Sequence, residues 1–93
     1  MDVEHRLEEM RFVLDIGGRE AELLYFVPEE GVLDLEHTFV PPDLRGSGAG
    51  GKVVRAALEY AREEGYRVRP SCSFVAAFIQ RHPEYQEMID DGP

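Results

Sequence analysis

Apolar and polar residues alternate between positions 10 and 40 in the manner of β-strands. Residues 10–16 (Met-Arg-Phe-Val-Leu-Asp-Ile) predict a strand, Gly17-Gly18 predicts a turn, and Arg19–Val27 predicts a second strand. After a further turn at Pro28–Gly31, the pattern predicts a third strand over Val32–Val40. Because these connections are too short for parallel crossovers, we expect an antiparallel meander.

The third predicted strand has a distinct inward face. Side chains two residues apart lie on the same face of a strand. The face expected to point into the core is therefore made of Leu33, Leu35, His37 and Phe39.

The apolar spacing changes to that of a helix near position 50. Gly51–Glu64 is predicted to be a helix, and Gly65 suits a left-handed C-cap. The helix repeats small and apolar residues at three- and four-residue intervals, at Val54, Ala57, Leu58 and Ala61. Tyr66–Pro70 then predicts a strand, which needs a parallel partner after such a crossover.

The remaining residues predict a second helix over 73–82 and a short turn or helix from Glu84 that frays by Asp90. The apolar face of the second helix is expected to contain Phe74, Ala77, Phe78 and Arg81. The elements together predict an α+β fold with a mixed α/β-type sheet, in which a meander precedes a helix-strand-helix unit. With 93 residues, we expect one domain over residues 1–93.

Composition narrows the class of protein. Apolar content of 43% is too high for a disordered chain, and no apolar run approaches the roughly 20 residues that span a bilayer. The first residues lack the pattern of a signal peptide, and a single cysteine excludes an intramolecular disulfide. We therefore expect a cytoplasmic protein that binds no membrane and, because its histidines and cysteine lack ligand spacing, no metal.

The formal charge of −9 argues against a nucleic-acid partner, because such binding depends on basic patches. The positive charges nevertheless gather in the second half of the chain, at Arg45, Lys52, Arg55, Arg67 and Arg69. The acidic remainder either attracts a cationic substrate such as an amine or forms a solvated surface. The sequence leaves both explanations open.

The stretch from Val40 to Lys52 is rich in glycine and lies where a strand gives way to a helix. Glycines let the backbone approach a ligand closely, and the following helix directs free N–H groups toward it. Its glycines fit the dinucleotide fingerprint, but the strand does not lead directly into them. They also nearly fit a P-loop, except that Val53 replaces the hydroxyl residue that would hold Mg²⁺.

A third pattern, Arg45-x-x-Gly48-x-Gly50, fits without exceptions. It resembles the coenzyme A pyrophosphate loop of the GNAT superfamily of N-acetyltransferases. The similarity extends over residues 32–85, through Val68-Arg-Pro-Ser-Cys-Ser-Phe-Val75 and Arg81-His-Pro-Glu-Tyr85. These blocks resemble the small, single-domain GNAT-like subgroup. The resemblance implies a shortened GNAT-like fold that lacks the helices found between the first two strands of fuller members.

The resemblance also implies acetyl-coenzyme A as co-substrate. Its pantetheine arm would pair with the backbone near Phe39 and Val40, and its thioester would lie near Cys72. The loop would hold the pyrophosphate. The residues implied in cofactor binding are Phe39, Val40, Arg45, Gly46, Ser47, Gly48, Ala49, Gly50 and Lys52.

Two residues are the main candidates for catalysis. Cys72 precedes a predicted helix, whose N-terminus lowers a thiol pKa, so it suits an acetyl-accepting nucleophile or a proton donor; the alternative is a buried apolar role. His37 suits a base, and the alternative is a satisfied core histidine. Glu36 is a weaker candidate base, and Tyr85 suits either a proton donor or an aromatic anchor for the C-terminal turn.

The resemblance places a catalytic tyrosine on the second helix, where this chain has Phe74 and Phe78. Three functions therefore remain open. The first is an acetyl-coenzyme A-dependent N-acetyltransferase acting on an unknown amine or protein, as a monomer or small homo-oligomer. The second is a catalytically silent coenzyme A-binding or acyl-sensing module, and the third is a domain that binds another nucleotide or phosphate.

Overall fold

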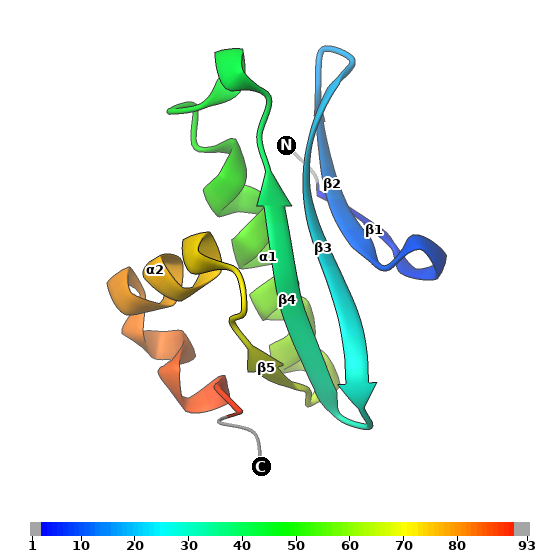
Figure 1. Ribbon diagram of the computed structural model, residues 1–93, viewed down its shortest axis with the longest axis vertical. Helices are drawn as coiled ribbons and strands as arrows, with labels where there is room; N and C mark the ends of the chain where they lie inside the picture. The colour runs from blue at the N-terminus through cyan, green and yellow to red at the C-terminus, as the bar shows by residue number, and fades with distance from the viewer. Residues whose placement is uncertain (1–2, 91–93) are drawn as a thin grey trace.

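The computed structural model describes residues 3–90 and contains one five-stranded sheet with two α-helices (Figure 1). The strands are β1 (Glu4–Arg6), β2 (Arg11–Ile16), β3 (Arg19–Glu29), β4 (Val32–Phe39) and β5 (Arg67–Arg69). The helices are α1 (Ala49–Glu64) and α2 (Ser73–Arg81). Short 3₁₀ turns occupy Leu7–Glu9, Pro42–Leu44 and Pro83–Met88.

The sheet has the order β1-β2-β3-β4-β5. The first four strands pair antiparallel, whereas β4 and β5 pair parallel after the crossover through α1. The predicted α+β class, the meander and the helix-strand-helix unit are confirmed. Strand β1 was not expected, because its three residues Glu4–Arg6 are too few for periodicity to stand out.

Strand β3 is longer than the sequence predicted. The prediction ended it at Val27 and assigned Pro28 to a turn, but the strand continues to Glu29. The pairing of β3 with β4 changes register between Phe26 and Glu29. Proline lacks an N–H and is tolerated at such irregular positions of a sheet. The expectation of a turn at Pro28 was therefore wrong.

A β-bulge in β4 overturns the expected inward face of that strand. Leu24 pairs with His37 and the next residue, Tyr25, pairs with Leu35, so Glu36 is an extra residue in β4. A bulge of this kind reverses the alternation of side chains beyond it. Leu35 is buried as predicted, but His37 is exposed and shares a face with Leu24 on the other side of the sheet.

Phe39 follows His37 to the outer side of the sheet, where it is also exposed. Thr38 takes the inward position instead, because it pairs with the buried Leu23. The prediction of one continuous inward face over Leu33, Leu35, His37 and Phe39 was therefore wrong in its second half. Because of the bulge, the side chain of Thr38 faces the inner side of the sheet at the end of β4, where the side chains of His37 and Phe39 were expected.

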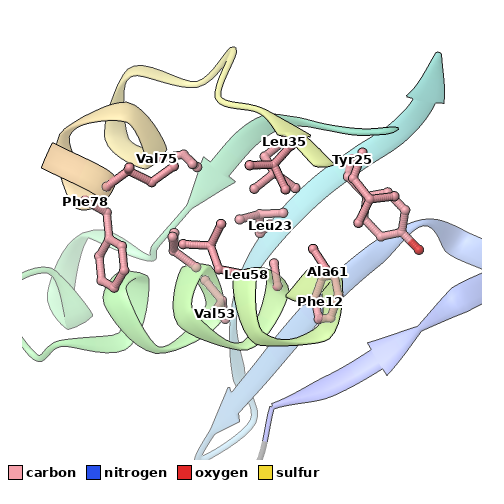
Figure 2. Close-up of a cluster of buried hydrophobic side chains, with 14 of the residues drawn as sticks. Phe12, Leu23, Tyr25, Leu35, Val53, Leu58, Ala61, Val75 and Phe78 are labelled. Atoms are coloured by element: carbon pink, nitrogen blue, oxygen red, sulfur yellow. The ribbon is translucent and has the colours of Figure 1, made fainter. Parts of the chain in front are cut away.

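Helix α1 packs against β2, β3, β4 and β5 and supplies the centre of the core. Its buried residues include the predicted positions Val54, Ala57, Leu58 and Ala61. Figure 2 shows Val53, Leu58 and Ala61 of α1 among side chains from the sheet and from α2. Deleting such a side chain, as in Leu58→Ala, is expected to cost about 2–5 kcal/mol of unfolding free energy.

Helix α2 contacts β4 and α1, and it buries a different face from the one predicted. Val75, Phe78 and Ile79 are buried, whereas Phe74 remains 40% exposed. The face expected from Phe74, Ala77, Phe78 and Arg81 is thus correct only at Phe78. Because α2 buries this other face, Phe74 stays partly exposed and lines a groove beside α1.

The C-terminal segment is attached to the sheet rather than frayed at Asp90. Ile89 forms a parallel bridge with Val68, and the Asp90 amide donates to the Val68 carbonyl at 2.8 Å. The Asp90 carboxylate also accepts from Arg69 Nε at 2.9 Å. This segment extends the sheet beyond β5 and corrects the expectation of fraying.

Among residues 3–90, no helix is both long enough and apolar enough to cross a membrane.

Candidate functional site

The site lies where β4 and β5 separate. The two strands pair only from Val32 to Asp34 on β4, and the last contact is the Cys72 amide donating to the Leu35 carbonyl at 3.0 Å. Beyond that point, of the strands described in residues 3–90, only β3 pairs with β4. The other backbone edge of β4 is therefore open for hydrogen bonding over residues 36–39.

A turn connects the end of β4 to α1. The Leu44 amide donates to the Pro41 carbonyl at 2.9 Å, and the Ser47 amide donates to the Leu44 carbonyl at 3.1 Å. Gly46 and Gly48 have φ values of 86° and 91°, a region that side-chain-bearing residues rarely adopt. These bonds and the two glycines fold the turn back toward the start of α1.

The turn and the first residues of α1 present free donors on a single short segment. Within residues 3–90, four backbone amides of this segment make no hydrogen bond: Gly46, Gly48, Gly50 and Gly51. The Ala49 amide is held by the Ser47 hydroxyl at 3.3 Å. The N-terminus of a helix carries a partial positive charge. This segment is accordingly suited to binding an anion.

Gly50 allows three elements to approach each other closely. A Cβ at this position would lie 2.8 Å from Cζ of Phe74 and 3.3 Å from Cγ2 of Val40. The first contact is shorter than side chains tolerate, so an alanine would displace the Phe74 ring. Glycine at position 50 therefore sets the distance between α1, α2 and the end of β4.

A groove of about 420 Å³ runs between the glycine turn and α2. Its walls come from residues 40–51 on one side and 74–82 on the other, including Val40, Leu44, Arg45, Gly48, Gly50, Phe74, Phe78, Arg81 and His82. A second hollow of about 290 Å³ adjoins it and shares Val40, Arg45 and Phe74. Its remaining residues are His37, Thr38 and Phe39.

The two hollows form a path from the bulge of β4 to the last turn of α2. Seven of the nine residues predicted to bind the cofactor line it: Phe39, Val40, Arg45, Gly46, Gly48, Ala49 and Gly50. Ser47 instead braces the turn through its hydroxyl. Lys52 is exposed on the first turn of α1, one residue beyond the lining.

The positive charges that lack acidic partners gather at this groove. Among the residues that the structure describes, six arginines form ion pairs with carboxylates. Within residues 3–90, no ion pair involves Arg45, Lys52, Arg67 or Arg81. Arg45 and Arg81 line the groove, and Lys52 is next to it. Although the chain has a net charge of −9, three of the four cations without an ion pair in the described part lie in or beside one cavity.

Cys72 occupies the N-cap position of α2, and its amide donates to the Leu35 carbonyl of β4. Its thiol lies 3.6 Å from the Thr38 hydroxyl, and Thr38 lines the smaller hollow. Burial raises the pKa of the Cys72 thiol, but hydrogen bonds from Thr38 and from the amides of Val75 and Phe74 outweigh it. The net pKa is therefore lowered.

The neighbouring serines do not cap α2. No side-chain hydrogen bond caps this helix, and its N-cap residue is Cys72 itself. Ser71 and Ser73 are exposed. The prediction that Cys72 precedes a helix N-terminus is confirmed.

His37 reaches the smaller hollow from the outer side of the sheet. It lies one residue from Thr38 and therefore on the opposite face from Cys72. The expectation that His37 shares an inward apolar face is wrong because of the bulge at Glu36. The two candidate catalytic side chains thus flank β4 from opposite sides.

Tyr85 is buried in the core and does not line the groove. Its side chain is 0% exposed, and its hydroxyl donates to Glu59 at 2.6 Å and accepts from Arg55 at 3.1 Å. Burial and the hydrogen bond to Glu59 raise the pKa of Tyr85. The interpretation of this residue as an aromatic anchor for the C-terminal turn is confirmed.

The sequence interpretation missed the part of the groove made by α2. Phe74, Phe78, Arg81 and His82 all line the groove. These positions follow the i, i+4, i+7, i+8 pattern of a single helix face. That pattern was assigned to core packing, since a face that lines a ligand groove and a face that enters the core have the same period.

No cluster of three or more metal-ligating side chains occurs in the part of the chain from residue 3 to residue 90.

Comparison with known proteins agrees with this geometry. The sequence profile of the GCN5-related N-acetyl-transferase family matches residues 11–88. "Protein NATD1" of Bos taurus is 32% identical over 91 residues, which cover 94% of this chain and 80% of that protein. "Protein NATD1" of Danio rerio is 31% identical over 91 residues, with 94% and 83% covered.

A solved structure shares the fold as well. The solution structure of a GCN5-like protein from Staphylococcus aureus superimposes with a TM-score of 0.75 and 26% identity. The match covers 99% of this chain and 90% of the other. The family match spans the sheet, the glycine turn and both helices. This chain belongs to the GCN5-related N-acetyltransferase family.

Proposed function

We propose that this protein transfers an acetyl group from acetyl-coenzyme A to an amine, with the cofactor lying in the groove between the glycine turn and α2. The observation that carries the proposal is the coincidence of free amides and unpaired cations in one cavity. The amides of Gly46, Gly48 and Gly50 suit a pyrophosphate. Membership of the family supports acetyl-coenzyme A as the source of that pyrophosphate.

The open edge of β4 supports the placement of the pantetheine arm. This arm contains two amide groups, which can pair with the open edge of β4 near Phe39 and with the backbone at Val40, whose carbonyl accepts from Arg45 Nε at 3.2 Å. The path then leads past Phe74 toward the separation of β4 and β5. A thioester at that end would lie near Thr38 and Cys72.

Acetyl transfer requires a neutral amine to attack the thioester carbonyl and form a tetrahedral intermediate. The carbon–sulfur bond then breaks, and the departing thiolate needs a proton. In direct transfer, the Cys72 thiol supplies that proton. In the covalent alternative, the Cys72 thiolate attacks the thioester carbonyl, the bond to the coenzyme A sulfur breaks, and coenzyme A leaves and takes up a proton. The amine then attacks the acetyl carbon of acetyl-Cys72, and the Cys72 sulfur is the leaving group.

We assign His37 the role of accepting the proton from the amine. It lines the smaller hollow and is exposed on the outer side of the sheet, so an acceptor can reach it without crossing the cofactor groove. Glu36 is the neighbouring bulge residue and is also exposed. The acceptor would then approach from the face opposite α1.

A silent coenzyme A-binding module is the second candidate. One observation favours it: α2 contributes Phe74 and Phe78 to the groove, where a hydroxyl would be needed for the family's usual proton donor. In this role the protein would bind acetyl-coenzyme A without consuming it. Replacement of Cys72 would then have little effect on the binding of acetyl-coenzyme A.

Release of free coenzyme A thiol in the presence of amines and lysine-containing peptides separates these candidates. We expect release with the wild-type protein and a large loss with His37→Gln. Intact-mass analysis after incubation with acetyl-coenzyme A alone distinguishes the two routes. A gain of one acetyl group that Cys72→Ala abolishes supports the covalent route, and turnover without a gain supports direct transfer. Binding without turnover for any acceptor would support the silent module.

A further inference from the structure

The groove extends beyond the segment that suits a pyrophosphate. Gly50 lies against Phe74 at one end, and Gly51 faces Phe78 one turn further along α2, with a distance of 3.6 Å from its ideal Cβ to Cε2 of Phe78. Arg81 and His82 line the same cavity at the end of α2. The glycine turn and these two residues are therefore opposite walls of one groove.

His82 is held in a defined orientation. Its ring stacks on Phe78 with 4.1 Å between centroids, and its Nδ1 lies 3.4 Å from Arg55 Nη2. A guanidinium can only donate hydrogen bonds, so Nδ1 is the acceptor and the ring proton lies on Nε2. Nε2 makes no hydrogen bond with the residues from 3 to 90. His82 thus presents an unused donor at the groove.

Arg81 supplies a full positive charge beside that donor. It forms no ion pair with any described residue, and it is exposed. The C-terminal end of α2 contributes about half a negative charge, which is less than the guanidinium charge. Glu84, the acid nearest in sequence, is engaged by Arg55 at 4.0 Å. The net positive charge at this end of the groove favours binding of an anion.

We propose that Arg81 and His82 form a second anion subsite, which binds the phosphate monoester at the nucleotide end of coenzyme A. The inference rests on the proposed function and adds a determinant of cofactor specificity to it. The pyrophosphate would occupy the glycine turn, and the 3′-phosphate of the ribose would lie across the groove at the end of α2. The subsite would make the protein prefer coenzyme A to 3′-dephospho-coenzyme A.

Calorimetric titration of the wild-type protein with these two ligands tests the proposal directly. 3′-Dephospho-coenzyme A cannot form the charge-assisted hydrogen bond made by the 3′-phosphate. We therefore expect it to bind about tenfold more weakly than coenzyme A. Arg81→Gln is expected to weaken coenzyme A binding by a similar factor and to leave the dephospho form unchanged. Arg67→Gln is the matched control: it removes one charge from a cation that bonds the Ile89 carbonyl, away from the groove.

The outcomes separate this inference from the proposed function. Equal affinity of the wild-type protein for both ligands would overturn the subsite and leave the pyrophosphate site standing. An equal effect of Arg81→Gln on both ligands, or an equal effect of Arg67→Gln and Arg81→Gln, would also overturn it. Absence of binding to either ligand would overturn the proposed function as well. The wild-type comparison decides the question even if the Arg81 variant folds poorly.

Discussion

The thiol of Cys72 lies 3.6 Å from the hydroxyl of Thr38, although the two residues are 34 positions apart in the sequence. The contact forms at the point where β4 and β5 cease to pair. It depends on the bulge at Glu36, which turns Thr38 rather than His37 toward α2. A thiol at the start of α2 and the hydroxyl that the bulge turns inward from β4 thus lie side by side.

This contact predicts an unusually reactive cysteine. The pKa of Cys72 is lowered, so a larger fraction of the thiol is ionised at neutral pH than in an ordinary cysteine. Thr38→Val keeps the shape of the side chain but removes the hydroxyl that stabilises the thiolate. We expect alkylation by iodoacetamide to require a higher pH in this variant. Overlapping pH–rate curves for the two proteins would show that Thr38 does not tune the thiol.

Gly50 and Gly51 provide a matched pair for testing the close approach of α1 and α2. Alanine favours a helix over glycine by about 1 kcal/mol, and at position 51 the added Cβ meets only an ordinary contact with Phe78. Gly51→Ala is therefore expected to raise the unfolding free energy by about 0.5–1 kcal/mol. At position 50 the contact with Phe74 offsets this gain.

Adding Phe74→Ala to Gly50→Ala relieves the steric contact and provides the control. In a double-mutant cycle measured by urea unfolding, we expect the Gly50→Ala change to become more favourable in the Phe74→Ala background. Additive effects of the two substitutions would contradict the close approach at Gly50.

Tyr85 is expected to affect stability and not chemistry. Tyr85→Phe removes its hydrogen bonds to Glu59 and Arg55, which predicts a loss of about 1–2 kcal/mol in unfolding free energy. Because the hydroxyl points to α1 and not into the groove, turnover per folded molecule should stay close to wild type. A strong fall in turnover with unchanged stability would instead identify Tyr85 as the proton donor.

His5 predicts a specific pH dependence of stability. Its ring stacks on Phe12, with 4.0 Å between centroids, and bonds the Tyr25 hydroxyl at 2.7 Å. Burial lowers the pKa of His5 below its ordinary value of 6.5. As pH falls through about 6.5, the unfolded chain takes up the proton before the folded one, so stability falls with pH.

His5→Gln removes this titrating group and serves as the comparison. We expect the difference in unfolding free energy between pH 7.5 and 5.5 (about one unit on either side of the unperturbed histidine pKa) to be smaller in the variant. A difference as large as in the wild type would assign the pH dependence to other groups.

The order of elements could be predicted from the sequence because local signals agreed with the fold. Gly17-Gly18 set the hairpin between β2 and β3, and the apolar spacing from Val54 to Ala61 identified the buried face of α1. The glycine pattern around Arg45 identified the turn that lines the groove. Each of these features is encoded within a few neighbouring residues.

The failures concern features that depend on pairing between distant residues. The bulge at Glu36 arises from the register between β3 and β4, which alternation within β4 alone does not reveal. The docking of Asp90 likewise depends on Val68 and Arg69. Arg81 and His82 were missed because their place beside the groove depends on how α2 packs against α1.

Calorimetric titration shows whether the glycine turn binds the pyrophosphate of acetyl-coenzyme A. The purified protein is titrated with acetyl-coenzyme A, and ATP and NADPH serve as controls that carry phosphates but no pantetheine arm. We expect saturable binding of acetyl-coenzyme A, much weaker binding of both controls, and loss of binding in Gly48→Val, where a branched side chain opposes the φ of 91°. Equal affinity for ATP, or no binding of acetyl-coenzyme A, would rule out the glycine turn as a coenzyme A site.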